Sequence, residues 1–104
     1  MKGGNKVSKE YPFITLMKII SVFNYKSGYV KNWNDTEELI TINEICLMLG
    51  INPSDINFLL SIWNYFGLAS EYKENNKRYL KISDKVISGI EKGNKIRYKL
   101  KNIK

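Results

Sequence analysis

Apolar side chains recur at helical intervals from Pro12 to about Tyr25 or Lys26, and they surround most of the helix that this spacing predicts. Proline is favoured in the first turn of a helix, and Gly28 lies just beyond the expected end. A helix at the surface of a small domain would show a polar half, which this one lacks. The helix is therefore expected to be covered on two sides. The second side is covered either by another subunit or by deep burial within one domain, and the sequence leaves both explanations open.

Two further helices are predicted on either side of a tight turn. Thr41 and Glu44 have the spacing of a capping box, and Gly50 is a natural C-terminal stop. The next helix is predicted to begin after Asn52, whose side chain is expected to cap it, with Pro53 in its first turn.

The helix over residues 54–66 divides into an apolar and a polar side at 100° per residue. The apolar side is expected in the core and holds Ile56, Leu59, Leu60, Trp63 and Phe66. The opposite side is available to a ligand and holds Ser54, Asn57, Phe58, Ser61, Asn64 and Tyr65.

Two strands, at residues 68–73 and 77–82, are predicted to form a hairpin. A three-residue loop over residues 74–76 would pair Leu68 with Ile82, whereas a two-residue Asn-Asn turn would pair Ile82 with Ala69. We favour the longer loop because it turns the larger apolar side chains inward. The tip would then display Lys73, Asn75, Asn76, Lys77 and Arg78.

The remaining segments are less regular. Residues 28–38 predict a long loop, in which Tyr29 and Trp33 either anchor the loop to the core or offer a contact surface. Residues 39–41 are expected to form a short strand that pairs with the hairpin.

A fourth helix is expected to begin with Ser83 as its cap and to stop at Gly93-Asn94. The tail that follows alternates apolar and cationic residues like an edge strand, yet its apolar spacing also fits a helix. Both conformations put apolar side chains on one side and cationic ones on the other.

The run EICLMLGINPSDI, at residues 44–56, resembles the helix-turn-helix of winged-helix transcription regulators of the MarR or PadR kind. Residues 66–69 are similar to the exit of a recognition helix into a wing, and residues 79–85 to the returning wing strand. The resemblance covers about residues 40–90. It implies an α+β, mostly helical fold: a winged helix-turn-helix with a three-helix core, a two-stranded wing and a C-terminal helix. The chain then divides into a flexible N-terminal arm at 1–10, a winged-helix domain at 11–92 and a basic tail at 93–104.

Composition limits the classes of function. A chain of 104 residues with 43% hydrophobic content forms one globular domain. There is no histidine and a single cysteine, Cys46, so Cys–His pairs, catalytic triads and structural zinc sites are excluded. We therefore expect no enzyme activity, no cofactor and no metal, and we expect Cys46 to be a reduced core thiol. The chain lacks a signal-peptide pattern and any apolar run of about 18 residues, which predicts a cytoplasmic location without membrane contact.

The net charge of +7 is unevenly placed. Residues 32–71 contain six carboxylates and no Lys or Arg, whereas residues 72–104 contain eleven basic residues against three acidic ones. A basic segment of this density favours a polyanion, with nucleic acid first and an anionic membrane surface second.

The leading hypothesis is a sequence-specific regulator that binds double-stranded DNA as a homodimer, formed through helix 12–26, the C-terminal segment or both. Helix 54–66 would enter the major groove, where Asn pairs well with adenine, and hairpin 68–82 would act as the wing. Contacts to about six phosphates would give log K against log salt a slope near −5. The expected DNA-binding residues are Ser54, Asn57, Phe58, Ser61, Asn64, Tyr65, Lys73, Asn75, Asn76, Lys77, Arg78 and Lys99.

An alternative function follows from what the predicted recognition helix lacks. It carries no Lys or Arg, and Phe58 stands where winged-helix regulators commonly have one, with Asp55 nearby. Direct readout of guanine is therefore not expected. Phe58 and Ile62 would form an exposed apolar strip, which more often marks a protein contact. The alternative is a protein-interaction module whose basic tail docks on an acidic partner or a nucleoprotein.

Overall fold

The computed structural model describes residues 11–34 and 38–102, with side chains described as far as Lys95. The predicted arm at residues 1–10 lies outside the described residues. Within them the protein is α+β and mostly helical, as expected, and its four strands form one antiparallel sheet in the order β1-β2-β4-β3. The helices are α2 (Pro12–Val22), α3 (Ile42–Leu49), α4 (Pro53–Tyr65) and α5 (Asp84–Asn102), and the strands are β1 (Asn24–Lys26), β2 (Tyr29–Lys31), β3 (Ala69–Glu74) and β4 (Lys77–Ile82).

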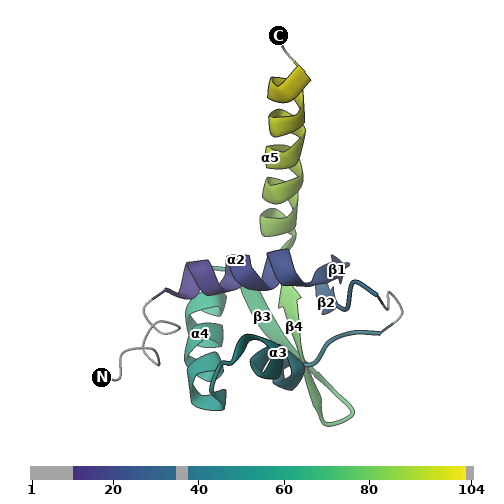
Figure 1. Ribbon diagram of the computed structural model, residues 1–104. Coiled ribbons are helices and arrows are strands. Elements are labelled where there is room, and N and C mark those ends of the chain that lie inside the picture. Colours follow the sequence, from purple (N-terminus) through teal and green to yellow (C-terminus); the bar gives the residue numbers. More distant parts are fainter. Residues whose placement is uncertain (1–10, 35–37, 103–104) are drawn as a thin grey trace.

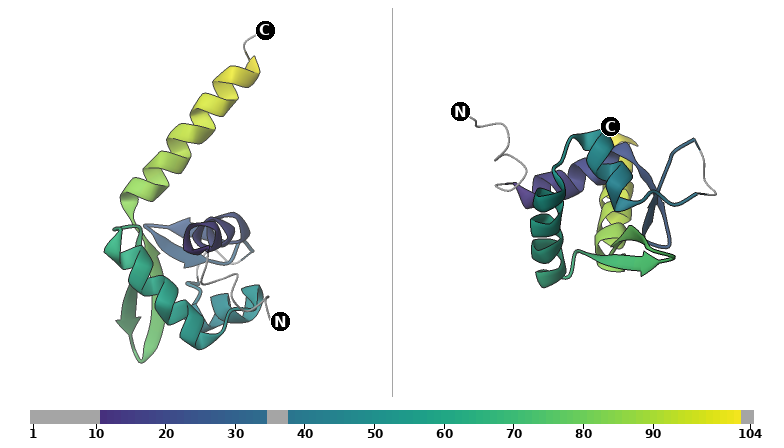
Figure 2. Two further views of the ribbon diagram at one scale, coloured as in Figure 1. Left: turned by 90° about the vertical axis from the view of Figure 1, so that its left-hand side faces the viewer. Right: turned by 90° about the horizontal axis from the view of Figure 1, so that it is seen from below.

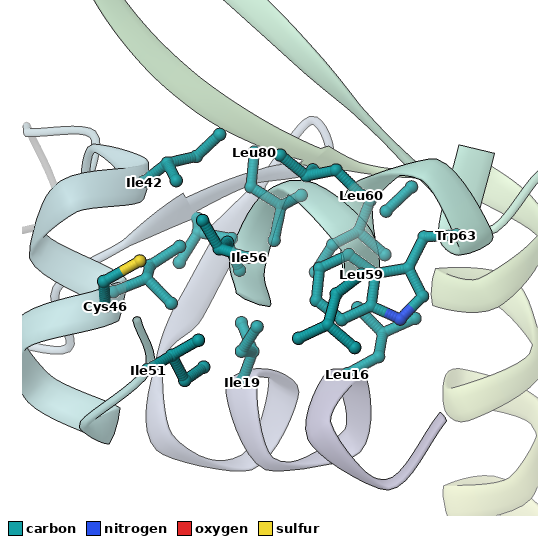
Figure 3. Packing of buried hydrophobic residues seen from close by; sticks show 14 of the residues in the cluster. Leu16, Ile19, Ile42, Cys46, Ile51, Ile56, Leu59, Leu60, Trp63 and Leu80 are labelled. Atoms are coloured by element: carbon teal, nitrogen blue, oxygen red, sulfur yellow. The ribbon is translucent and has the colours of Figure 1, made fainter. Parts of the chain in front are cut away.

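Helices α2, α3 and α4 surround one apolar core that the sheet completes (Figures 1 and 3). Trp63 of α4 is fully buried at its centre, and its Nε1 donates a 2.8 Å hydrogen bond to the Pro12 carbonyl of α2. The predicted apolar side of α4 is confirmed for Ile56, Leu59, Leu60 and Trp63. The prediction for Phe66 is wrong: this residue follows the last turn of α4, is 51% exposed and rests against the Phe13 ring at 5.5 Å.

The turn between α3 and α4 follows the sequence signals closely. The capping box is present, because Glu44 N donates to Thr41 Oγ1 at 3.2 Å and Thr41 N donates to Glu44 Oε1 at 2.8 Å. Gly50 adopts the left-handed conformation at φ 69°, and the chain bends by 114° between the two helices. Asn52 is the N-cap residue of α4, but its side chain makes no capping hydrogen bond, contrary to expectation. Pro53 in the first turn lacks an N–H, so one fewer donor needs a cap.

Residues 24–31 form a second hairpin that the sequence analysis assigned to a helix end and a loop. α2 ends at Val22 instead of reaching Tyr25 or Lys26. Ser27 and Gly28 then have φ values of 55° and 87°, as a two-residue turn of the primed type requires. The hairpin buries Val30 and places Tyr29 opposite Lys81 of β4, which extends the sheet.

Gly28 sits where the two hairpins meet. Its carbonyl accepts a 2.6 Å hydrogen bond from Ile82 N, and a Cβ at this position would lie 2.6 Å from the Ile82 carbonyl oxygen. We expect Gly28→Ala to lower the free energy of unfolding by at least about 2 kcal/mol, because it adds this clash to a left-handed backbone. Gly50→Ala is the matched control, since Gly50 is also left-handed but has no heavy atom within 4 Å of the added Cβ. Both variants are measured by urea titration, in which Gly50→Ala should lower the free energy of unfolding by only about 1 kcal/mol. Equal losses for the two variants would show that the backbone at Gly28 can move away from Ile82.

The β3–β4 hairpin has the register that the sequence analysis did not favour. Asn75 and Asn76 form a two-residue turn at φ 53° and 63°, and Ala69 pairs with Ile82. Asn tolerates the left-handed region, and this turn matches the twist of the strands better than a longer loop. Residues 39–41 do not form the expected strand. Their predicted pairing with the β3–β4 hairpin is present only as an isolated bridge between Thr41 and Tyr79.

α5 is one continuous helix of 19 residues, so the predicted stop at Gly93-Asn94 is wrong. Gly93 does not adopt the left-handed conformation that ends α3 at Gly50, and a helical glycine only weakens the helix by about 1 kcal/mol. Ser83 precedes the helix, but in the described part of the chain its hydroxyl has no hydrogen-bond partner and therefore does not cap it. Only the first turns of α5 reach the core, through Val86 and Ile87, and the rest stands clear of the body (Figures 1 and 2).

Among the described residues no single helix is long and apolar enough to cross a membrane, although α3 and α4 together pass the same test as a bent pair.

Candidate functional site

The outward side of α4 carries the residues that the sequence analysis placed there. Ser54, Asn57, Phe58, Ser61, Asn64 and Tyr65 are all exposed, and the exposure of Tyr65 reaches 83%. Asp55 is only 5% exposed, so its carboxylate does not lie on this surface. Ile62 is half-buried, which leaves Phe58 without the long apolar strip that was expected beside it.

This surface has two parts. Ser54, Phe58, Ser61 and Tyr65 lie within a narrow arc at 100° per residue and form the outer ridge of α4. Asn57 and Asn64 lie on the edge that faces β3. Together with Leu60, Ser61, Ser70 and Glu71 they line an open groove of about 340 Å³ between the helix and the strand. The groove is lined by amide, hydroxyl and carboxylate groups, which are suited to hydrogen bonding.

Arg78 of β4 joins the hairpin to this helix. Its Nε donates to Glu71 Oε2 at 2.9 Å, and its Nη2 donates to Glu71 Oε1 at 3.2 Å and to Asn57 Oδ1 at 2.7 Å. The guanidinium therefore bridges the carboxylate of β3 and the amide of α4. From the sequence, Arg78 and Asn57 are expected in the site only as separate residues, and Glu71 is not expected there.

The Glu71–Arg78 pair has a defined pH dependence. The hydrogen bond from Arg78 lowers the pKa of the Glu71 carboxyl below its usual range. A lowered pKa in the folded state means that the pair contributes stability above the ordinary pKa of glutamate, and that this contribution is lost as the pH falls through the lowered value. Both side chains are about one-third exposed, so solvent screens the pair.

Cys46 does not belong to this surface. It is a free thiol in the core, as predicted, and burial raises its pKa. In the described part of the chain no three His, Cys, Asp or Glu side chains gather into a possible metal site.

The hairpin tip carries exposed amide and positively charged side chains. Lys73, Asn75, Asn76 and Lys77 are exposed there, and the hairpin projects beyond α3 at the end of the molecule opposite α5 (Figure 1). The sequence analysis grouped Lys99 with these residues. The backbone of Lys99 lies in α5, whereas its side chain is outside those described. The structure thus brings α4 and the hairpin together, whereas α5 beyond its first turns stands clear of them (Figure 1).

Comparisons of the chain with protein-family models, with curated proteins and with solved structures gave no match.

Proposed function

We propose that the protein is a winged helix-turn-helix regulator that binds double-stranded DNA, with α4 in the major groove and the β3–β4 hairpin as its wing. The observation that carries the proposal is the exposed polar side of α4 lying next to a hairpin with lysines at its tip, on one end of the molecule. The 114° bend between α3 and α4 falls in the range of helix-turn-helix units, in which the second helix enters the groove. The proposal includes the cytoplasmic location and the absence of enzyme activity expected from the sequence.

The division of the α4 surface suits the two kinds of contact that a DNA-binding helix makes. Ser54 on the ridge offers a hydroxyl to a phosphate or a base edge. Ser61 donates its hydroxyl hydrogen to the Asn57 carbonyl and can accept from a base edge, and Phe58 offers an apolar contact to a thymine methyl group. Asn57 and Asn64 face the groove beside β3, where their amides can reach base edges. Lys73 and Lys77 at the wing tip supply the contacts to the DNA backbone.

The decisive experiment is selection of bound duplexes from random DNA by the full chain at about 150 mM salt. Enrichment of a common sequence supports the proposal, and an unenriched pool would contradict it. On the selected duplex, the Asn57→Ala and Asn64→Ala changes should each cost about 1–3 kcal/mol of binding free energy if these amides contact bases. Unchanged affinity for both variants would exclude α4 as the reading helix.

We further propose that the regulator is a homodimer that forms through α2. Phe13, Ile14, Met17 and Phe66 are each about half exposed and form an apolar patch across α2 and the end of α4, with Lys18 exposed beside Met17. Such patches are typical of subunit contacts. α2 crosses the end of the body from which α5 leaves, so a second copy there leaves the hairpin tip free (Figure 1).

The dimer is tested by introducing charge into the patch. Ile14→Glu combined with Met17→Glu should convert a dimer into a monomer in sedimentation equilibrium and weaken binding to the selected duplex. The control is Leu47→Glu, because Leu47 is 82% exposed on α3, outside the patch. A wild-type monomer, or a dimer that survives the double change, would contradict this assembly.

The alternative of a protein-interaction module is favoured by two aromatic residues on the α4 ridge, Phe58 at 44% and Tyr65 at 83% exposure. Under this alternative the selection from random DNA enriches no common sequence, whereas Phe58→Ala abolishes binding to an acidic protein partner. Under the regulator proposal Phe58→Ala weakens DNA binding instead.

A further inference from the structure

Asn57 is the one outward residue of α4 whose amide is held by the neighbouring hairpin in the described structure. Its Oδ1 accepts the 2.7 Å hydrogen bond from Arg78 Nη2, and its backbone carbonyl accepts one from Ser61 Oγ at 3.2 Å. Arginine carries only donors, so the amide must present its oxygen to Arg78 and turn its NH₂ group away. The side chain remains exposed, so this NH₂ group is available to a ligand.

Arg78 is in turn fixed by Glu71. Two hydrogen bonds from the guanidinium to the two carboxylate oxygens form a fork-to-fork pair, which holds the plane of the guanidinium as well as its position. The carboxylate also offsets the positive charge of the arginine. The chain Glu71–Arg78–Asn57 therefore spans three elements, β3, β4 and α4, and ends on a side chain that faces outward.

We infer that Arg78 is a positioning residue that turns the oxygen of Asn57 toward the hairpin and its NH₂ group outward, so that Asn57 selects guanine over adenine in the bound duplex. This inference rests on the proposed function. An unrestrained Asn pairs with adenine through both ends of its amide: the oxygen accepts from N6, and the nitrogen donates to N7. The hydrogen bond from Arg78 uses only one of the two lone pairs of this oxygen, but it turns the oxygen toward the hairpin. The oxygen and the NH₂ group then no longer face the adenine edge together, so that two-point contact is lost. The NH₂ group can still donate to N7 and O6 of guanine, which are both acceptors, whereas the adenine N6 amino group would face it as a second donor.

The inference differs from the expectation from the sequence, which paired the asparagines with adenine and did not expect direct readout of guanine because the helix carries no Lys or Arg. The cation that bears on the helix comes from the hairpin. It acts through Asn57 and not by direct contact with a base.

The test compares duplexes selected by the wild-type chain and by variants. Asn57→Ala identifies the base pair that Asn57 contacts, because the preference at that position is lost. The wild-type chain should prefer guanine there. Arg78→Ala leaves the Asn57 amide free to rotate, so the preference for guanine over adenine at this position should shift toward adenine by about tenfold. The measurement is the ratio of the Kd values for two duplexes that differ only at this base pair.

Two further variants separate positioning from charge and folding. Lys77→Ala removes a neighbouring exposed cation on β4, and it should weaken binding to both duplexes alike without changing the ratio. Glu71→Ala removes the carboxylate that fixes the Arg78 guanidinium but keeps Arg78 itself, so it should also shift the guanine-to-adenine ratio toward adenine. This variant supplies the test if Arg78→Ala fails to fold. An adenine preference in the wild-type chain, or an unchanged ratio in both the Arg78 and Glu71 variants, would overturn this inference and leave the regulator proposal standing. A wild-type chain that selects no sequence would overturn both.

Discussion

Replacing Trp63 by alanine should cost about 3–5 kcal/mol of unfolding free energy, which is a large part of the roughly 5–15 kcal/mol that stabilises a domain of this size. The indole is fully buried at the centre of the core, and its Nε1 hydrogen bond to the Pro12 carbonyl ties α4 to the first turn of α2. Alanine would leave a large cavity and a carbonyl without its partner. The measurement is a urea titration followed by far-ultraviolet circular dichroism.

Trp63→Phe is the matched control, because it keeps an aromatic ring in the core and removes the N–H donor. It should cost about 2 kcal/mol, from the lost hydrogen bond and the smaller ring together. A loss below about 1 kcal/mol for Trp63→Ala would mean that α2 is not docked on α4 in solution. The apolar patch proposed for the dimer, which spans both helices, would then lack its support.

The sequence predicts best where the signals are local. Thr41, Glu44 and Gly50 each act within one or two turns of α3, through side-chain and backbone groups that are neighbours in the chain. The exposed and buried faces of α4 follow from helical geometry alone, so periodicity in the sequence is sufficient to assign them. Phe66 was misplaced because the helix ends one residue earlier, at Tyr65, and the helical angle no longer applies there.

The wrong predictions fall where turn-forming residues and the spacing of apolar residues favour different structures. The continuous apolar run before Tyr25 favours a helix, yet Ser27-Gly28 is a turn pair between two short segments that are long enough to be strands. The same preference for apolar spacing led to the wrong register at Asn75-Asn76, where a primed two-residue turn was the stronger signal. In the β3–β4 hairpin the backbone conformation of the turn outweighs the gain from turning one more large side chain inward.

Only part of the candidate site could be predicted, because some of its residues are far apart in the sequence. The outward residues of α4 could be named from periodicity, but Arg78 is 21 residues from the Asn57 that it contacts. The link also needs the correct hairpin register, which places Glu71 opposite Leu80 and thus diagonal to Arg78 on the neighbouring strand. A tertiary contact of this kind has no local signal, so the sequence pattern could not indicate the role of Glu71.

Removing both lysines at the hairpin tip, by Lys73→Ala with Lys77→Ala, should weaken DNA binding by roughly 10²–10³-fold at about 150 mM salt. Each lysine that neutralises a phosphate contributes a slope of about −0.9 to log K against log salt, and the proposed dimer carries two copies of each. If six phosphates are contacted, the slope should fall from about −5 to about −2. The measurement is a fluorescence-anisotropy titration at several salt concentrations.

The matched control is Lys92→Ala with Lys95→Ala, which removes the same charge from exposed positions on α5. α5 leaves the body on the side away from the tip, and exposed charges farther apart than about 8 Å are screened at this salt concentration (Figure 1). These changes should therefore alter the affinity less than about threefold. An equal loss from both pairs would show that the duplex responds to the total charge of a basic chain and not to a wing beside α4. A larger loss from the α5 pair would place the duplex on α5, and α4 could then no longer be the helix that reads it.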